Sequence, residues 1–195
     1  MFIRTENFQA YIRSFPAVSG LILFFVLIFV LTLFPGPLGQ FIYINGTGVN
    51  LYIENGQWWR LATPIFLHGS FTHLLLNSFS LAIFGPGLEK LIGSARFILF
   101  FLTAGILASA ATYLFHPLTY SHVGASGAIF GVLGFYVYLA AFKKSLFTAN
   151  EVNTIYTLTV IGVIMTFIQP QINATGHIAG LAAGFITARL FWNKR

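Results

Sequence analysis

The sequence predicts an all-α integral membrane protein, a bundle of six transmembrane helices with a long first loop in the membrane interface. Two features of composition support this fold class: 57% of the 195 residues are hydrophobic, and only 7% are charged. A soluble domain carries about 25% charged residues, so this chain has too few to cover itself with a polar surface. The third feature is a series of long uncharged runs, which supply the roughly 20 apolar residues that a membrane-crossing helix needs.

The first hydrophobic run predicts a membrane anchor followed by the interfacial loop. The run covers roughly residues 18–34 and is stopped by Pro35-Gly36-Pro37. No small-residue cleavage site follows it and further spans do, so we interpret it as a retained helix rather than a signal peptide. Residues 39–70 are interrupted by Gly and Asn and contain Trp58-Trp59-Arg60, which we interpret as an interface anchor because Trp is enriched at membrane interfaces.

Three later stretches predict five more helices. Residues 71–88 form one apolar helix. Residues 97–142 are uncharged and long enough for two helices, with a break at His116-Pro117. Residues 152–188 again suit two helices, with the break at Gln169-Pro170. The predicted total is six.

The basic residues lie at alternate ends of these helices and therefore predict the topology. Cytoplasmic loops of membrane proteins are enriched in Lys and Arg, so the ends that carry most of them face the cytoplasm. Both termini are then cytoplasmic, and residues 39–70, 116–125 and 169–175 face outside. One set of helix ends carries only Arg60, and the other carries Arg4, Arg13, Lys90, Arg96, Lys143, Lys144, Arg189, Lys194 and Arg195.

Several mechanisms are excluded by what the sequence lacks. It contains no cysteine, which removes disulfides, thiolate metal sites and a cysteine nucleophile. It contains no aspartate and no His-Glu-x-x-His run, which removes the paired-aspartate and zinc routes to proteolysis. The net charge of +6 is explained by topology, so we expect no nucleic-acid partner. No cofactor or metal is expected either.

A serine and a histidine stand where two membrane helices begin at the outer side. Ser126 lies in Gly124-Ala125-Ser126-Gly127, and His177 lies in Gly176-His177-Ile178-Ala179-Gly180. Polar side chains in lipid are costly, so their default interpretation is functional. A serine needs a base within hydrogen-bond reach, and histidine is the usual one. Since no carboxylate lies near, we predict a Ser–His dyad, with Phe130 one turn after Ser126 and placed to stack on the imidazole.

Other polar residues of the outer leaflet predict an oxyanion site. His73 and Asn77 are four residues apart and therefore project from one face of their helix. Their side chains, together with the backbone N–H of Ser126, can donate to a tetrahedral intermediate. Small-residue stripes would let the last helix approach the serine-bearing helix closely. These stripes are Gly127 and Gly131 on one helix and Gly176, Gly180 and Gly184 on the other.

Each of these residues also has a structural interpretation. A serine at this place more often caps a helix than catalyses a reaction. Asn77 is equally suited to a hydrogen bond between helices. His116 and His122 are expected to be loop histidines, solvated or bonded to backbone.

Taken together, these motifs resemble those of the rhomboid proteases in their minimal six-helix bacterial form. Where that family often has a tyrosine one turn after the nucleophile, this chain has Phe130. The resemblance implies that Ser126 is the nucleophile and His177 the base, that His73 and Asn77 bind the oxyanion, and that His68 lines the site near water and substrate entry. The matching pieces are Trp59-Arg60, His68, His73-Leu74-Leu75-Leu76-Asn77, Gly87-Leu88-Glu89-Lys90, the Gly124–Gly127 run and the Gly176–Gly180 run with Gly184.

The resemblance also implies a function and a setting. The expected activity is serine endopeptidase cleavage of single-pass transmembrane proteins near the outer end of their helix, in the cell membrane, with the active site on the outer side. Residues 1–195 are expected to form one rhomboid-like membrane domain, with a cytoplasmic segment at 1–17 and Glu89 as a structural tie; no particular oligomeric state is favoured. The alternative is a catalytically inactive rhomboid-like protein that binds membrane clients. A transporter is disfavoured because the polar residues cluster at one depth instead of following a pathway.

Overall fold

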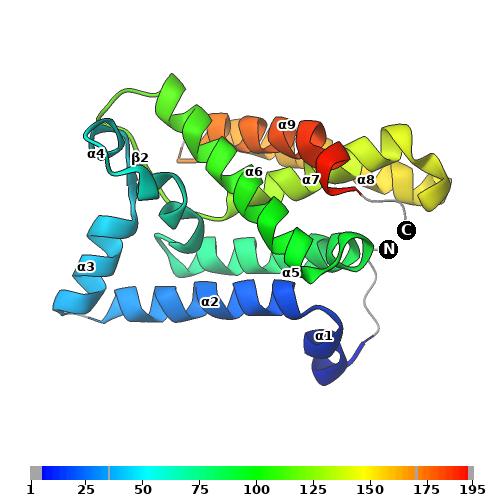
Figure 1. The fold of residues 1–195 in the computed structure, drawn as a ribbon, viewed down its shortest axis with the longest axis horizontal. Helices are drawn as coiled ribbons and strands as arrows, with labels where there is room; N and C mark the ends of the chain where they lie inside the picture. Colours follow the sequence, from blue (N-terminus) through cyan, green and yellow to red (C-terminus); the bar gives the residue numbers. More distant parts are fainter. Residues whose placement is uncertain (1–5, 35, 170, 193–195) are drawn as a thin grey trace.

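A computed structural model of the chain describes residues 6–34, 36–169 and 171–192 and shows an all-α bundle. A helix stands at each of the six predicted places. Figure 1 shows α2 and α5 lying side by side, α6 crossing them obliquely, and α7, α8 and α9 forming the rest of the bundle. The six helices are α2 (Pro16–Leu33), α5 (Phe71–Ile92), α6 (Ser94–Phe115), α7 (Ser126–Phe142), α8 (Ala149–Ile168) and α9 (Ala174–Phe191).

Four of these helices, α2, α5, α6 and α8, are long and apolar enough to cross a membrane. The serine-bearing helix α7 is apolar but shorter, at 17 residues. The all-α membrane bundle predicted from composition is therefore confirmed, whereas the number of six spans stays a prediction. The predicted stop at Pro35 and break at Pro170 lie outside the described residues.

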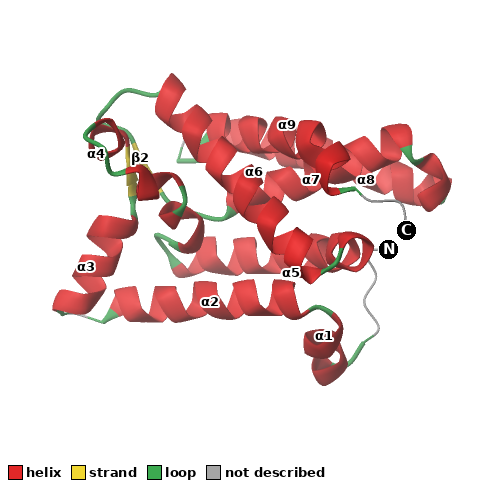
Figure 2. Ribbon diagram, viewed as in Figure 1, coloured by secondary structure: helices red, strands yellow, loops and turns green. Residues whose placement is uncertain are grey.

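The segment predicted as an interfacial loop is more ordered than expected. It holds two short α-helices, two 3-10 turns and a strand, and Figure 2 shows these small elements beside the long helices. Backbone groups away from bulk water must find hydrogen-bond partners locally, and short helices provide them. The elements are α3 (Pro37–Gly46), β1 (Gly48–Val49), α4 (Asn50–Glu54), η1 (Trp58–Leu61) and η2 (Thr63–Phe66), and a seven-residue helix, α1 (Phe8–Ser14), precedes α2.

This first-loop region is tied to the segment that leads into α7. Strand β1 pairs antiparallel with β2 (Ser121–His122), with Gly48 opposite His122. A Cβ on Gly48 would come within 2.6 Å of the His122 ring, so the close pairing requires glycine. The backbone N–H of Gly124 donates to the Pro64 carbonyl at 2.8 Å. The loop thus fixes the backbone two residues before Ser126.

Arg60 differs from the prediction that it belongs to an interface anchor. Trp58 and Trp59 are exposed, as an anchor requires, but Arg60 is only 2% exposed. Its guanidinium donates to the carbonyls of Ile44 and Thr47 at 2.7 and 2.6 Å. Arginine has five N–H donors in a fixed fork, so one buried side chain satisfies several loop carbonyls at once. Arg60 is therefore an internal brace of the first loop.

Glu89 connects three parts of the bundle, as its predicted structural role requires. Its two carboxylate oxygens accept from the backbone N–H groups of Ala17 and Val18, each at 2.9 Å. These amides open α2, where no intrahelical partner exists and the helix dipole favours a negative charge. The Ser94 hydroxyl donates to the same carboxylate at 2.7 Å and ties in the start of α6.

Replacing Glu89 with Ala is expected to destabilise the protein by about 3 kcal/mol or more, because the change leaves two helix-end amides buried without an acceptor. Ser94→Ala removes only one of the three bonds and should cost about 1 kcal/mol. Thermal unfolding of both variants in the same detergent measures the difference. Equal melting temperatures for the two variants would contradict the assigned role of the carboxylate.

Helices α7 and α9 make the most extensive contact in the bundle. The predicted glycine stripes lie within it. A Cβ on Gly180 would collide with the carbonyl oxygen of Gly127, and one on Gly184 would collide with that of Gly131. Only glycine allows two backbones to touch in this way. The close approach predicted from the stripes is confirmed, and it brings the start of α9 against the start of α7.

Candidate active site

Ser126 is the first residue of α7 and does not cap it. The N-cap position is occupied by Ala125, and no side chain makes a cap hydrogen bond there. The capping interpretation of this serine is therefore wrong. The side chain is half-buried and makes no hydrogen bond to another described residue. Its hydroxyl is thus available to a base or to a substrate.

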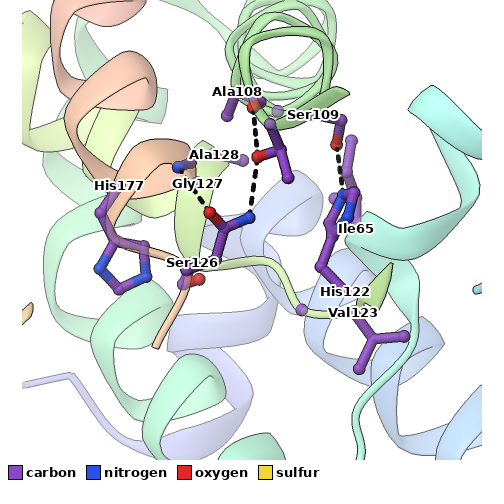
Figure 3. Close-up of a pocket in the computed structure, with 14 residues that line it drawn as sticks. Ile65, Ala108, Ser109, His122, Val123, Ser126, Gly127, Ala128 and His177 are labelled. Atoms are coloured by element: carbon purple, nitrogen blue, oxygen red, sulfur yellow. Dashed lines mark hydrogen bonds between the residues drawn. The ribbon is translucent and has the colours of Figure 1, made fainter. Parts of the chain in front are cut away.

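Ser126 and His177 line the same cavity, which Figure 3 shows between the start of α7, α6 and the start of α9. No hydrogen bond joins the two side chains among the described residues. Such catalytic hydrogen bonds are often long or poorly aligned before substrate binds. The rest of the lining includes Gly124, Ser109, Thr112 and His122.

His177 lies in the first turn of α9 and is held on two sides. Its ring is stacked on Phe130, with centroids 4.2 Å apart and planes at 19°, which confirms the stacking expected from sequence. The ring nitrogen Nδ1 lies 2.8 Å from the Thr166 hydroxyl of α8. Sequence reasoning missed Thr166, because nothing in its local sequence indicates which residue of α8 faces the imidazole.

The start of α9 is fixed by Asn173, which sequence reasoning also missed. Its side-chain oxygen accepts from the Gly176 N–H at 2.9 Å, as an N-cap does. Its amide donates to the Thr112 hydroxyl of α6 at 2.8 Å, and that hydroxyl donates to the Ala108 carbonyl. An Asn three residues before Gly176 was a usable capping signal. The cap fixes the position of the turn that carries His177.

His73 and Asn77 lie on α5, and the His73 ring packs against Gly124, two residues before Ser126. A Cβ on Gly124 would lie 2.6 Å from the His73 ring, and Gly124 has φ +123, so glycine is needed there for space and for backbone angle. The Asn77 amide donates to the His73 carbonyl at 2.9 Å within the same helix. This bond is intrahelical, and one amide proton of Asn77 remains for another acceptor.

His68 precedes α5 and is buried beside His73, with ring centroids 5.1 Å apart. Burial, helped by the charge of His73, lowers the pKa of His68 to about 4. The imidazole is therefore neutral at physiological pH. His68, His73, Asn77 and Phe130 are not part of the lining of the cavity that Ser126 and His177 share.

The two other histidines differ from the loop histidines expected from sequence. The Nε2 of His122 lies 3.3 Å from the Ser109 hydroxyl, and burial lowers the pKa of His122 to about 4. The Nε2 of His116 lies 2.9 Å from the Thr175 hydroxyl, and its ring stacks on Tyr120 at 4.0 Å. Both rings therefore bond to side chains rather than to backbone or solvent alone. They link the α6–α7 connection to α6 and α9.

The fold and the site together define a class of protein: a multi-pass membrane protein with polar residues at the ends of its apolar helices. The chain belongs to the rhomboid family: residues 55–194 match the model of the Rhomboid domain. It is 43% identical over 195 residues to YdcA of Bacillus subtilis (strain 168), covering 100% of this chain and 98% of the relative.

Two relatives whose names describe proteases extend the comparison. The rhomboid protease GluP of Bacillus subtilis (strain 168) is 41% identical over 143 residues, which cover 73% of this chain and 28% of GluP. Rhomboid-like protease 3 of Toxoplasma gondii is 29% identical over 147 residues, which cover 72% of this chain and 54% of the relative. This chain thus spans less than a third of GluP and nearly the whole of YdcA.

Proposed function

We propose that this protein is an intramembrane serine endopeptidase in which Ser126 is the nucleophile and His177 the general base. The observation that carries the proposal is that two side chains line one cavity in a membrane bundle: a serine with no hydrogen bond to another described residue, and a buried, stacked imidazole. Relatives named as rhomboid proteases support the same activity. Thus the Ser126 oxygen attacks the scissile carbonyl, His177 accepts its proton, and the same imidazole returns the proton to the leaving amine.

The oxyanion formed in this attack requires donors that are already in place. The Ser126 N–H opens α7 and has no intrahelical acceptor. The His73 ring, packed against Gly124, and the remaining amide proton of Asn77 supply further donors.

The proposed substrates are single-pass transmembrane proteins cut near the outer end of their helix. A helical peptide hides its carbonyls in its own hydrogen bonds, so the cleaved segment must be locally unwound, which Gly, Ala or Pro favours. Gly124 and Gly127 line the cavity beside Ser126 and add no side chain to it.

The test is to incubate the purified protein in lipid vesicles with a panel of single-pass helices and to map the products by mass spectrometry. The proposal predicts cuts near the outer helix ends, absent from Ser126→Ala. A panel of helices that carry unwound small-residue segments and yet stay intact would contradict it.

We further propose that both termini are cytoplasmic in the cell membrane, so that the active site faces outside. Cysteines introduced next to Met1 and Arg195 should resist an impermeant thiol reagent in intact cells, and one at Asn45 of α3 should react. Because the native chain has no cysteine, every label reports an introduced site. Labelling at either terminus in sealed cells would invert the proposed orientation.

A further inference from the structure

The Thr166 side chain is one of three that are buried on α8. Among the four helices that are long and apolar enough to cross a membrane, α8 is the least buried. Its buried residues are Ile155, Thr159 and Thr166, and Thr166 is only 2% exposed. A hydroxyl in such a place is costly unless it is bonded. Thr166 forms two contacts there, one within α8 and one to His177.

The proton count of this hydroxyl fixes the direction of the contact with His177. Thr166 Oγ1 donates to the Gly162 carbonyl at 2.9 Å. A hydroxyl has one proton, so its oxygen faces the imidazole as an acceptor. Nδ1 of His177 lies 2.8 Å away, and in the tautomer with a proton on Nδ1 it donates to this oxygen. A neutral imidazole with a proton on Nδ1 keeps the lone pair on Nε2, the nitrogen that a base needs free.

The second constraint on the ring, Phe130, does not fix this tautomer. Stacking at 19° holds the plane of the imidazole, but a phenyl face has no group that distinguishes one ring nitrogen from the other. Phe130 also has no hydroxyl. The contact with Thr166 therefore specifies how the His177 ring is rotated within its own plane. It thereby also specifies which ring nitrogen carries the proton.

We propose that Thr166 is a positioning residue that orients His177 and holds it in the Nδ1–H tautomer, the task that a carboxylate performs in a catalytic triad. The inference rests on the proposed role of His177 as the base. It makes α8 part of the active site, although α8 contributes no residue to the cavity lining.

The kinetic test compares Thr166→Val with Thr159→Val. Thr159 is a matched control because it is buried on the same helix and its hydroxyl donates to the Ile155 carbonyl at 2.8 Å. Valine keeps the shape and removes the acceptor. We expect kcat to fall about tenfold in Thr166→Val, because one hydrogen bond is lost, and KM to stay within twofold of wild type. In Thr159→Val, kcat should stay unchanged. Thr166→Ser, which keeps the hydroxyl, should recover at least a third of the wild-type kcat.

A spectroscopic readout separates positioning from general packing. In protein labelled with ¹⁵N-histidine, the His177 signals are identified by their loss in His177→Gln. We expect a proton on Nδ1 in the wild type and in Thr159→Val, and its loss from Nδ1 in Thr166→Val. A wild-type ring protonated on Nε2, or a Thr166→Val kcat less than threefold below wild type, would overturn the proposal.

Failure of this inference is distinguishable from failure of the proposed function. If the protein is not a serine protease of this type, wild type itself produces no cleavage that depends on Ser126. If the function holds and Thr166 has no positioning role, wild type and Thr166→Val cleave alike. Adding the Ser126→Ala substitution then removes the activity of both.

Discussion

Cleavage is expected to disappear in both Ser126→Ala and His177→Ala, with a loss of at least about 1000-fold in kcat. A serine nucleophile and its base act as a unit, so removing either one costs nearly as much as removing both. The double variant should therefore be no slower than the slower single variant. Turnover of a purified single-pass substrate in vesicles, quantified by mass spectrometry, measures all three.

The structure also predicts how the two variants differ in stability. Ser126→Ala removes a half-buried hydroxyl that has no described partner, so its melting temperature should match wild type. His177→Ala removes a ring that packs on Phe130 and bonds Thr166, and its melting temperature should fall. If both folded variants keep more than a few per cent of wild-type turnover, the nucleophile lies elsewhere.

The second large effect is expected at His73 and Asn77. If their side chains donate to the oxyanion, replacing either with Ala should lower kcat by roughly 100- to 1000-fold in a dry site, and by less where water replaces the donor. Neither variant should be fully inactive, because the Ser126 N–H remains. The double variant should lose less than the product of the single losses if both donors serve one oxygen.

A purely structural role for Asn77 predicts a different result. Its side-chain amide donates to the His73 carbonyl of its own helix, so Asn77→Ala would then lower the melting temperature and leave kcat of the folded fraction normal. Asn45→Ala is a suitable control, because Asn45 makes the same bond to the Phe41 carbonyl on α3, away from the cavity. Normal kcat in both His73→Ala and Asn77→Ala would remove these residues from the site.

The features that sequence predicted correctly are those encoded locally. Uncharged runs predicted an all-α membrane bundle, and glycines spaced by one turn predicted the contact of α7 with α9. The spacing of Phe130 from Ser126 placed a ring on the serine-bearing helix where it stacks on His177. Each of these depends on the period of one helix and on the cost of polar groups in lipid.

The features that sequence missed depend on contacts between distant segments. Arg60 follows two interfacial tryptophans and gives no local sign that its guanidinium turns inward to the carbonyls of α3 and the turn after it. Thr166 is one of several threonines on α8, and only the rotation of α8 against α9 decides that this one meets His177. The interfacial segment was predicted as a loop because glycine is typical of loops. Its short helices are stabilised by tertiary contacts, which the local sequence does not indicate.

The central claim is that Ser126 is activated by His177, and covalent labelling tests it most directly. Purified wild-type protein is treated with a fluorophosphonate, which reacts with an activated serine, and the modified residue is identified by peptide mass spectrometry. The account predicts one modified serine, Ser126, with labelling lost in His177→Ala and retained, though slower, in Thr166→Val. Labelling of Ser126 at an equal rate in wild type and His177→Ala, or a label at another serine that persists in Ser126→Ala, would contradict it.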